Sequence, residues 1–380
     1  LAESFNQPLD SWDVSNVTDM SFMFFDAKSF DQPLNNWDVS NVTSMRGLFG
    51  GSDFDVIFNQ PINNWDVSNV TDMAGVFQNN ITFNQFIGNW DVSNVTNMLA
   101  MFFNAKSFDQ PVNNWNVSNV TNMSSMFEDA ENFNQNLNNW DVSNVTDMSF
   151  MFFDAKSFDQ PLNNWDVSNV ESMAGLFGGF DFDMIFNQPI NNWDVSSVTS
   201  MSTMFQKNIA FNQSLNMWDV SNVTNMKWMF NRASSFNQPL NNWDVSNVVN
   251  MRTMFQQADA FDQDISGWNT ANATNMDYMF TNADIFNQDI SSWCVEQIPT
   301  EPTNFALNSP LQASFKPNWG ATCSFNNPDF TLASNGVTCL CPNANFGDIG
   351  TLTVNGVNKT FTKRTRAQLD AIIANDVDDP

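Results

Sequence analysis

Tryptophan recurs at a fixed interval through most of the chain, and this interval constrains the fold more than any other feature. Between the first and last of these tryptophans the steps measure 25 residues, except for two steps of 28. Such a period is typical of a repeat protein, in which each repeat packs mainly against its neighbours. The positions are Trp12, Trp37, Trp65, Trp90, Trp115, Trp140, Trp165, Trp193, Trp218, Trp243, Trp268 and Trp293.

The two longer repeats carry matching insertions of three residues. These lie in GLFGGSDFDVIFNQ (47–60) and GLFGGFDFDMIFNQ (175–188), which are 128 residues apart. Residues 12–42 are also identical to residues 140–170. A block of five repeats was therefore duplicated, and little has changed since.

Each repeat contains two patterns that predict regular structure. The motif L-x-x-W-x-V, for example in residues 34–39, ends in an apolar and polar alternation that predicts a short strand. Apolar residues in 42–49 are spaced i, i+3, i+6 and i+7, which predicts one face of a short helix, capped by Ser40 and Asn41. The sequence therefore predicts an α/β solenoid of about twelve coils, each with a strand and a helix, over residues 1–293.

Stacked coils would join the Trp, Met and Phe side chains into one continuous core. This arrangement accounts for 38 Phe and 21 Met in a chain whose mean hydropathy is mildly polar. One Gln per repeat keeps its register from Gln7 to Gln288. Because an amide can both donate and accept, this register predicts a buried ladder of Gln side chains between coils.

The charge balance excludes several classes of function. The chain has 41 acidic and 13 basic side chains and no histidine, so the usual acid/base catalyst and commonest metal ligand are missing. Up to Trp293 we count 33 acids against 8 bases, a balance that repels nucleic acid and anionic lipid. No apolar run approaches the roughly 20 residues needed to cross a bilayer. The chain opens at Leu1 within a repeat, without a signal peptide, and so reads as a processed product or an excerpt.

Residues 294–380 depart from the repeat and are expected to form a Cys-containing C-terminal cap or linker. Four cysteines in this part predict two disulfides and an oxidising compartment. Cys294 would pair with Cys339 or Cys341 and Cys323 with the other, or Cys294 with Cys323; a four-thiolate zinc site is the alternative. TLTVNGVNKTF (351–361) predicts a hairpin and TRAQLDAIIANDV (365–377) a short helix.

The segment L-x-x-W-x-V-x-N-V is similar to a leucine-rich-repeat strand with Trp in one Leu position. Together with the core W-D-V-S-N-V-T-x-M, the repeat over residues 4–293 resembles that of the BspA-like leucine-rich-repeat surface proteins, a family also described from mycoplasma lipoproteins. The resemblance implies a leucine-rich-repeat-like fold, an extracellular or cell-surface location, and adhesion or protein binding without catalysis. The family pattern has no catalytic residues to transfer.

Asn-Val-Thr sequons recur in the repeat, but we expect their Asn to have a structural role. Asn169 and Asn247 are retained where the sequon is lost, which favours a capping function over glycan attachment. The off-register sequons at Asn80, Asn212 and Asn358 are the candidate glycosylation sites if the host is eukaryotic. The in-register sequons begin at Asn16, Asn41, Asn69, Asn94, Asn119, Asn144, Asn222 and Asn272.

An Asp follows Trp in nine of the twelve repeats, and stacked carboxylates raise the alternative of a calcium ladder. The simpler interpretation is that each Asp accepts hydrogen bonds from turn amides or from the following Ser, since Asn116 and Asn269 replace it in two repeats. We therefore expect no cofactor, with calcium as the alternative. The nine residues are Asp13, Asp38, Asp66, Asp91, Asp141, Asp166, Asp194, Asp219 and Asp244.

A single Thr per repeat, as at Thr43 and Thr71, was also considered for ice or crystal binding. Ice binding needs several rows of Thr on a flat strand surface, whereas this sequence predicts a single row at the starts of helices. Glycosidase-like pairing of two carboxylates is conceivable in a chain so rich in Asp, but nothing distinguishes one pair from the rest. The sequence predicts no enzymatic activity.

The predicted function is that of a non-enzymatic extracellular structural or adhesive protein of a surface coat, appendage or filament. The alternative is a protein- or glycan-binding adhesion module. Expected partners are other copies of the chain, surface proteins and glycans, without nucleic acid or membrane insertion. The two insertions place Phe54 and Phe182 outside the repeat pattern, so these are the expected contact sites.

Overall fold

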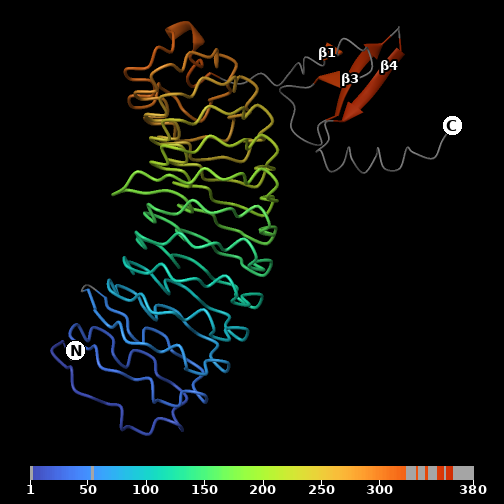
Figure 1. The fold of residues 1–380 in the computed structure, drawn as a ribbon. Coiled ribbons are helices and arrows are strands. Elements are labelled where there is room, and N and C mark those ends of the chain that lie inside the picture. The colour runs from blue at the N-terminus through green and yellow to red at the C-terminus, as the bar shows by residue number, and fades with distance from the viewer. Residues whose placement is uncertain are drawn as a thin grey trace.

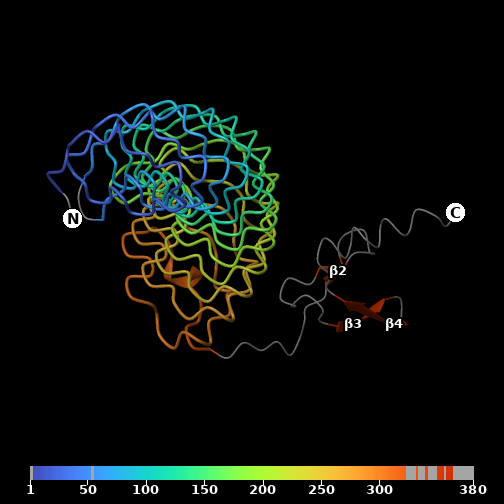
Figure 2. The same ribbon diagram turned by 90° about the horizontal axis from the view of Figure 1, so that it is seen from below.

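The computed structural model describes residues 3–52 and 55–321, and four short strands beyond residue 330. The repeats form a curved stack of coils that runs from the blue N-terminal end to the orange end (Figure 1). Viewed along the stack, successive coils lie over one another and rotate gradually (Figure 2). The repeats are therefore arranged in tandem, each against its neighbours.

The predicted α/β solenoid is wrong. Apart from the 3-10 helix η1 (Ala313–Phe315), the described residues contain no helix, and the coils contain only isolated β-bridges. Neither the strand nor the helix expected in each coil, nor the leucine-rich-repeat strand, is formed in this part of the chain.

Each coil consists instead of tight turns, in which an N–H donates to the carbonyl three residues earlier. In the coil that begins at Met98, these bonds join Met101 to Met98 at 3.2 Å and Ala105 to Phe102 at 3.0 Å. Bonds of 3.1 and 2.9 Å close two more turns within residues 112–120. Because both ends of each turn face the core, apolar residues recur every three positions. This spacing overlaps with that of a helix face, which is why the pattern predicts a helix that does not form.

The backbone conformation also excludes a helix. We call the Met that ends each W-D-V-S-N-V-T-x-M motif, such as Met98, the repeat Met. The second and sixth residues after it have positive φ, for example Ala100 (52°) and Asn104 (53°), whereas every residue of a right-handed helix has negative φ. Gly47 (62°) and Gly175 (67°) adopt this conformation without a Cβ clash with their own backbone. Gly, Asn and Asp at these positions are the sequence signal for turns, because they tolerate positive φ best.

Hydrogen bonds between coils use the N–H groups that a helix would bond internally. Ala100 donates to the Ser124 carbonyl and Phe102 to the Met126 carbonyl, both at 2.9 Å. Single-residue parallel bridges continue this ladder along the stack. They join Asp19, Ser44, Asp72, Asn97, Asn122, Asp147, Ser172, Ser200, Asn225, Asn250 and Asn275 in this order.

The predicted continuous core is confirmed. Two Phe per coil alternate in one column of stacked rings: Phe102 lies 4.0 Å from Phe108 and 5.5 Å from Phe127, which lies 3.9 Å from Phe133. All four side chains are fully buried. The indole of Trp140 is buried beside this column, and its N–H donates to a carbonyl of the preceding coils at 3.0 Å.

The duplicated segment shows how much burial comes from the neighbouring coil. Trp140 is 3% exposed and Met151 is fully buried, because residues 115–139 cover them. Their counterparts in the identical first copy, Trp12 and Met23, are 54% and 39% exposed. The core of each coil is therefore completed by the coil before it.

The Gln side chains link coils as predicted, but not by the predicted contact. Gln110 Nε2 donates to Asn84 Oδ1 at 3.0 Å, and the same oxygen accepts the backbone N–H of Asp109 at 3.0 Å. Gln135 donates in the same way to Asp109 Oδ1 at 2.8 Å. The ladder thus runs from Gln to the Asn or Asp of the preceding coil, and these Gln side chains are half-buried rather than buried.

The stack continues beyond Trp293 into one further coil. Phe305 and Leu311 are buried in the same core, and Trp319 packs edge-on against Phe305 at 4.9 Å. Tyr278 donates its N–H to the Thr303 carbonyl, as Ala100 does to Ser124, the residue after Met123. Pro302 therefore occupies the position of the repeat Met. Since proline has no N–H, this coil has one fewer donor for a further coil. The described part of the C-terminal region therefore extends the stack by one coil.

Beyond residue 330 the structure contains two antiparallel pairs. Strand β1 (Thr331–Leu332) pairs with β2 (Cys339–Leu340). Strand β3 (Ile349–Val354) pairs with β4 (Val357–Thr362), which confirms the predicted hairpin about residues 355–356. The helix predicted at 365–377 lies outside the described residues.

Candidate functional site

The coils differ from one another mainly along one face. The W-D-V-S-N-V-T corners are nearly identical in every coil, whereas the residues one, two, five, six and eight positions after the repeat Met vary. We call these positions the variable face; their side chains lie outside the stacked aromatic core. At the second position the residues are Phe22, Gly47, Gly75, Ala100, Ser125, Phe150, Gly175, Thr203, Trp228, Thr253 and Tyr278.

Every basic residue up to Trp293 lies at one of these variable positions. Five of them pair with a carboxylate, as Lys106 does with Glu131 at 3.3 Å. The near-identical corners carry no base at all. The eight residues are Lys28, Arg46, Lys106, Lys156, Lys207, Lys227, Arg232 and Arg252. The register of these bases within the repeat is the signal in the sequence that identifies the variable face.

The second insertion folds over a buried carboxylate on this face. Asp154 is 3% exposed, and its oxygens accept the backbone N–H groups of Phe180 and Phe182 at 3.0 and 3.1 Å. Phe182, predicted as a contact site, is half-buried, and Lys156 Nζ lies 4.1 Å from the centroid of its ring. The exposed aromatic of the insertion is Phe180, at 52%. Phe54, predicted in the first insertion, lies outside the described residues.

Carboxyl groups gather beside this insertion. Burial raises the pKa of Glu128 to about 7; the Ser125 hydroxyl opposes this rise, and the charges of Asp129 and Asp154 add to it. Burial also raises the pKa of Asp129 to about 6, with the charges of Asp154 and Asp181 adding to the effect. This part of the face therefore exchanges protons near neutral pH.

The Asp residues of the corners bond to their own turn, as the simpler interpretation predicts. Asp38 Oδ1 accepts the hydroxyl of Ser40 at 2.6 Å and its N–H at 3.1 Å, and these bonds lower the pKa of Asp38. Asp141 makes the same bonds to Ser143. Among the described residues, no group of three or more carboxylate or Cys side chains is arranged to hold a metal ion.

The Asn of each in-register sequon after the first bonds to the preceding coil. Asn144 Nδ2 donates to the Ser118 carbonyl at 2.7 Å, and the same bond recurs from Asn41 to Asn272. Among the off-register candidates, Asn80 is fully buried and donates to a backbone carbonyl, so it is not an accessible acceptor in the folded chain. Asn212 is exposed, and Asn358 lies in β4, of which only the backbone is described.

We expect Asn144→Ala to lower the free energy of unfolding by about 1 kcal/mol, because the Ser118 carbonyl loses its donor. Asn16→Ala is the matched control: its surrounding sequence is identical, but no coil precedes it within the described residues. Urea denaturation of both variants measures the difference. Equal losses at the two positions would contradict the inter-coil role of this amide.

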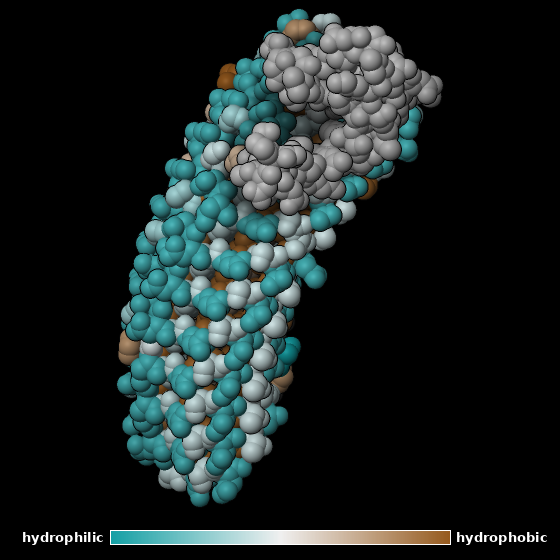
Figure 3. All heavy atoms as spheres, turned by 90° about the vertical axis from the view of Figure 1, so that its right-hand side faces the viewer, coloured by the Kyte–Doolittle hydropathy of each residue, from teal (hydrophilic) through white to brown (hydrophobic). Residues whose placement is uncertain are grey.

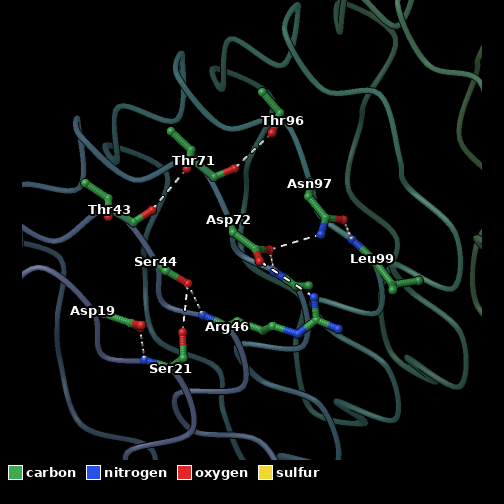
Figure 4. A network of polar contacts seen from close by, with 11 residues as sticks. Asp19, Ser21, Thr43, Ser44, Arg46, Thr71, Asp72, Thr96, Asn97 and Leu99 are labelled. Carbon is green, nitrogen blue, oxygen red and sulfur yellow. Dashed lines mark hydrogen bonds and ion pairs between the residues drawn. The ribbon is translucent and has the colours of Figure 1, made fainter.

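The Thr ladder also joins coils rather than starting helices (Figure 4). Thr71 donates its hydroxyl to the Thr43 carbonyl at 3.2 Å, and Thr96 to the Thr71 carbonyl at 3.3 Å. One residue further on, Asn97 Nδ2 donates to Asp72 Oδ1 at 3.1 Å. Figure 3 shows that hydrophilic residues also form regular rows along one face of the stack. The corners therefore have a structural explanation in both their Asn and their Thr.

Cys294 is disulfide-bonded. Cys339 lies in β2, whereas Cys323 and Cys341 lie outside the described residues. Within the described part of the chain, no helix has the length and apolar character required to cross a membrane.

The family described as "Mycoplasma protein of unknown function, DUF285" matches five overlapping segments: residues 1–85, 53–120, 76–182, 160–247 and 214–319. The chain belongs to this family. Its repeats are the tandem units of the family, and the match does not extend to the leucine-rich-repeat assignment. Neither the curated proteins nor the solved structures contain a match to the chain.

Proposed function

We propose that this DUF285 protein is a non-enzymatic adhesive protein of the cell surface or extracellular space, which binds its ligand with the variable face. The observation that carries this proposal is the division of the stack into near-identical corners and one variable face. The corners are accounted for by bonds within and between coils. Up to Trp293 every base lies on the variable face, as do the aromatic residues Phe22, Phe150, Trp228 and Tyr278.

This division favours a binding module over a coat or filament protein. A filament built from equivalent contacts would be expected to use the surfaces that repeat in every coil, and those side chains already bond to their neighbours. Resemblance to BspA-like surface repeats supports the extracellular location, as does the disulfide at Cys294. Exposed Phe180 replaces Phe182 as the contact site of the second insertion.

Adhesion of protein-coated beads to arrays of extracellular glycans and matrix proteins tests the proposal. A variant with Phe150, Phe180 and Tyr278 changed to Ser is expected to lose binding. A control with Thr96, Thr121 and Thr146 changed to Ser alters only the corners and should bind normally, once circular dichroism has shown that both variants fold. Absence of any ligand for the unmodified chain, or equal loss in the two variants, would reject the proposed function.

A further inference from the structure

Three basic side chains on the variable face have no carboxylate partner. Lys227, Arg232 and Arg252 form no ion pair with any residue that the structure describes. The other six bases in the same part of the chain each lie within 4.0 Å of a carboxylate. In a chain of formal net charge −28, unpaired cations on two neighbouring coils are unexpected unless they meet an external anion.

Aromatic rings lie directly against these cations. Lys227 Nζ is 4.2 Å from the ring centroid of Trp228, and the guanidinium carbon of Arg252 is 5.8 Å from that of Tyr278. The ring of Phe180, from the second insertion, meets Trp228 edge-on at 6.0 Å. The cations are therefore held against ring faces before any ligand arrives.

The patch is continuous across neighbouring coils. The backbone N–H of Trp228 donates to the Arg252 carbonyl at 3.0 Å, so the Lys227–Trp228 pair lies beside the Arg252–Tyr278 pair. Arg232 lies four residues after Trp228 in the same coil, and its Nε–H donates to Gln257 Oε1 of the next coil at 2.9 Å. We call Phe180, Lys227, Trp228, Arg232, Arg252 and Tyr278 the basic-aromatic patch.

Side-chain amides adjoin the patch. Asn231 donates to the Gln256 carbonyl and side chain at 3.2 and 3.3 Å. The side-chain oxygen of Gln206, a residue that is 6% exposed, has no donor among the described residues. Amides next to aromatic rings provide both donors and acceptors for hydroxyl groups.

The backbone of this face cannot accept a peptide as an added strand. The N–H groups of Trp228 and Phe230 donate to the next coil, and those of Met229 and Asn231 close turns within their own coil. Recognition here therefore depends on side chains, without the main-chain pairing that gives extended peptides their affinity.

We propose that the basic-aromatic patch binds an acidic polysaccharide carrying sulfate or carboxylate groups. Sugar rings stack on Trp228 and Tyr278, hydroxyl groups bond to the amides, and Lys227, Arg232 and Arg252 bind the anionic substituents. A polysaccharide with well-separated charges is favoured over nucleic acid, because the acidic remainder of the chain repels a densely charged duplex. This inference rests on the proposed function and specifies its ligand.

Asp277 stands in the next coil at the position that Arg252 has in its own, and its Oδ1 accepts the backbone N–H of Thr303 at 2.8 Å.

Calorimetric titration with short dextran sulfate and oligogalacturonate chains tests the proposal, with neutral dextran, poly-glutamate and duplex DNA as competitors. Arg252→Gln is expected to weaken dextran sulfate binding about tenfold, through loss of a charge-assisted contact. Arg46→Gln is the matched control, since Arg46 has the same position in its repeat but pairs with Asp72 at 3.7 Å. Trp228→Ala should weaken binding, whereas Phe22→Ala, at the same position of the first repeat and outside the patch, should leave it unchanged.

Equal weakening by Arg252→Gln and Arg46→Gln would show a diffuse charge effect and overturn the proposal. Poly-glutamate or DNA binding as tight as that of the sulfated glycan would also overturn it, in favour of another polyanion. If the chain binds neutral glycans or matrix proteins through the variable face but neither acidic polysaccharide, this inference fails while the proposed function stands.

Discussion

Phe152→Ala is expected to lower the free energy of unfolding by about 3–5 kcal/mol, the largest effect of any single substitution proposed for this chain. The Phe152 ring is fully buried and stacks on four others: Phe158 at 3.9 Å, Phe127 at 5.8 Å, Phe177 at 5.9 Å and Trp165 at 6.4 Å. Removing it opens a cavity that joins three successive coils. Urea denaturation followed by tryptophan fluorescence measures the loss.

The duplication supplies the matched control. Phe24 occupies the same position in an identical stretch of sequence. It stacks on Phe30 and Trp37 and on Phe49 of the next coil, but no ring of a preceding coil stacks on it among the described residues. Phe24→Ala should therefore cost about 1–2 kcal/mol less than Phe152→Ala. Equal costs would show that the aromatic column does not couple one coil to the next.

The repeat and its core could be predicted from the sequence, because burial depends on residue type and period. Leu34, Trp37 and Met45 were all expected to face inward, and all are buried. The secondary structure could not be obtained in this way. A turn whose first and last residues enter the core produces the same three-residue spacing as a helix, and hydrophobicity alone does not distinguish them.

Backbone conformation would have distinguished turn from helix. Gly47, Gly75 and Gly175 share one position of the repeat, and Asn or Asp often occupies the sixth position after Met, as at Asn104 and Asp154. Residues that tolerate positive φ at both the second and the sixth position after Met indicate turns. Other coils place Thr203 or Trp228 at the second position, and this variation obscures the signal when the repeats are read only for their apolar residues.

The candidate site was harder to predict, since a repeat directs attention to what recurs. The nine corner Asp residues recur and were considered for calcium, but Asp38 and its equivalents bond to their own turns. The residues that remain for a ligand are those that do not recur, such as Lys227 and Arg252. Their clustering depends on contacts between coils, which the linear order of the chain does not display.

Glu128→Gln is expected to stabilise the protein above neutral pH and to have little effect in acid. Burial raises the pKa of Glu128 from an ordinary value of 4.5 to about 7 in the folded chain. Below about pH 4.5 the carboxyl is protonated in both folded and unfolded states and costs nothing. As the pH rises from 4.5 to 7, the unfolded chain releases this proton while the folded chain retains it, so the wild-type chain loses stability; above pH 7 the folded state holds the charge beside Asp129 and Asp154 and the loss is complete.

The pKa shift corresponds to a destabilisation on the order of 3 kcal/mol at pH 8, which Glu128→Gln should remove. The fold accommodates Gln here, because Gln78 and Gln256 occupy the same position in other coils. Glu131→Gln is the control of opposite sign: the hydrogen bond from Lys156 lowers the pKa of Glu131, so removing its charge should destabilise the chain at pH 8. Free energies of unfolding measured from pH 5 to 8 decide between these outcomes. A wild-type curve parallel to that of Glu128→Gln over this range would mean that Glu128 is not held protonated by burial, and that the carboxyl groups beside the second insertion are open to water.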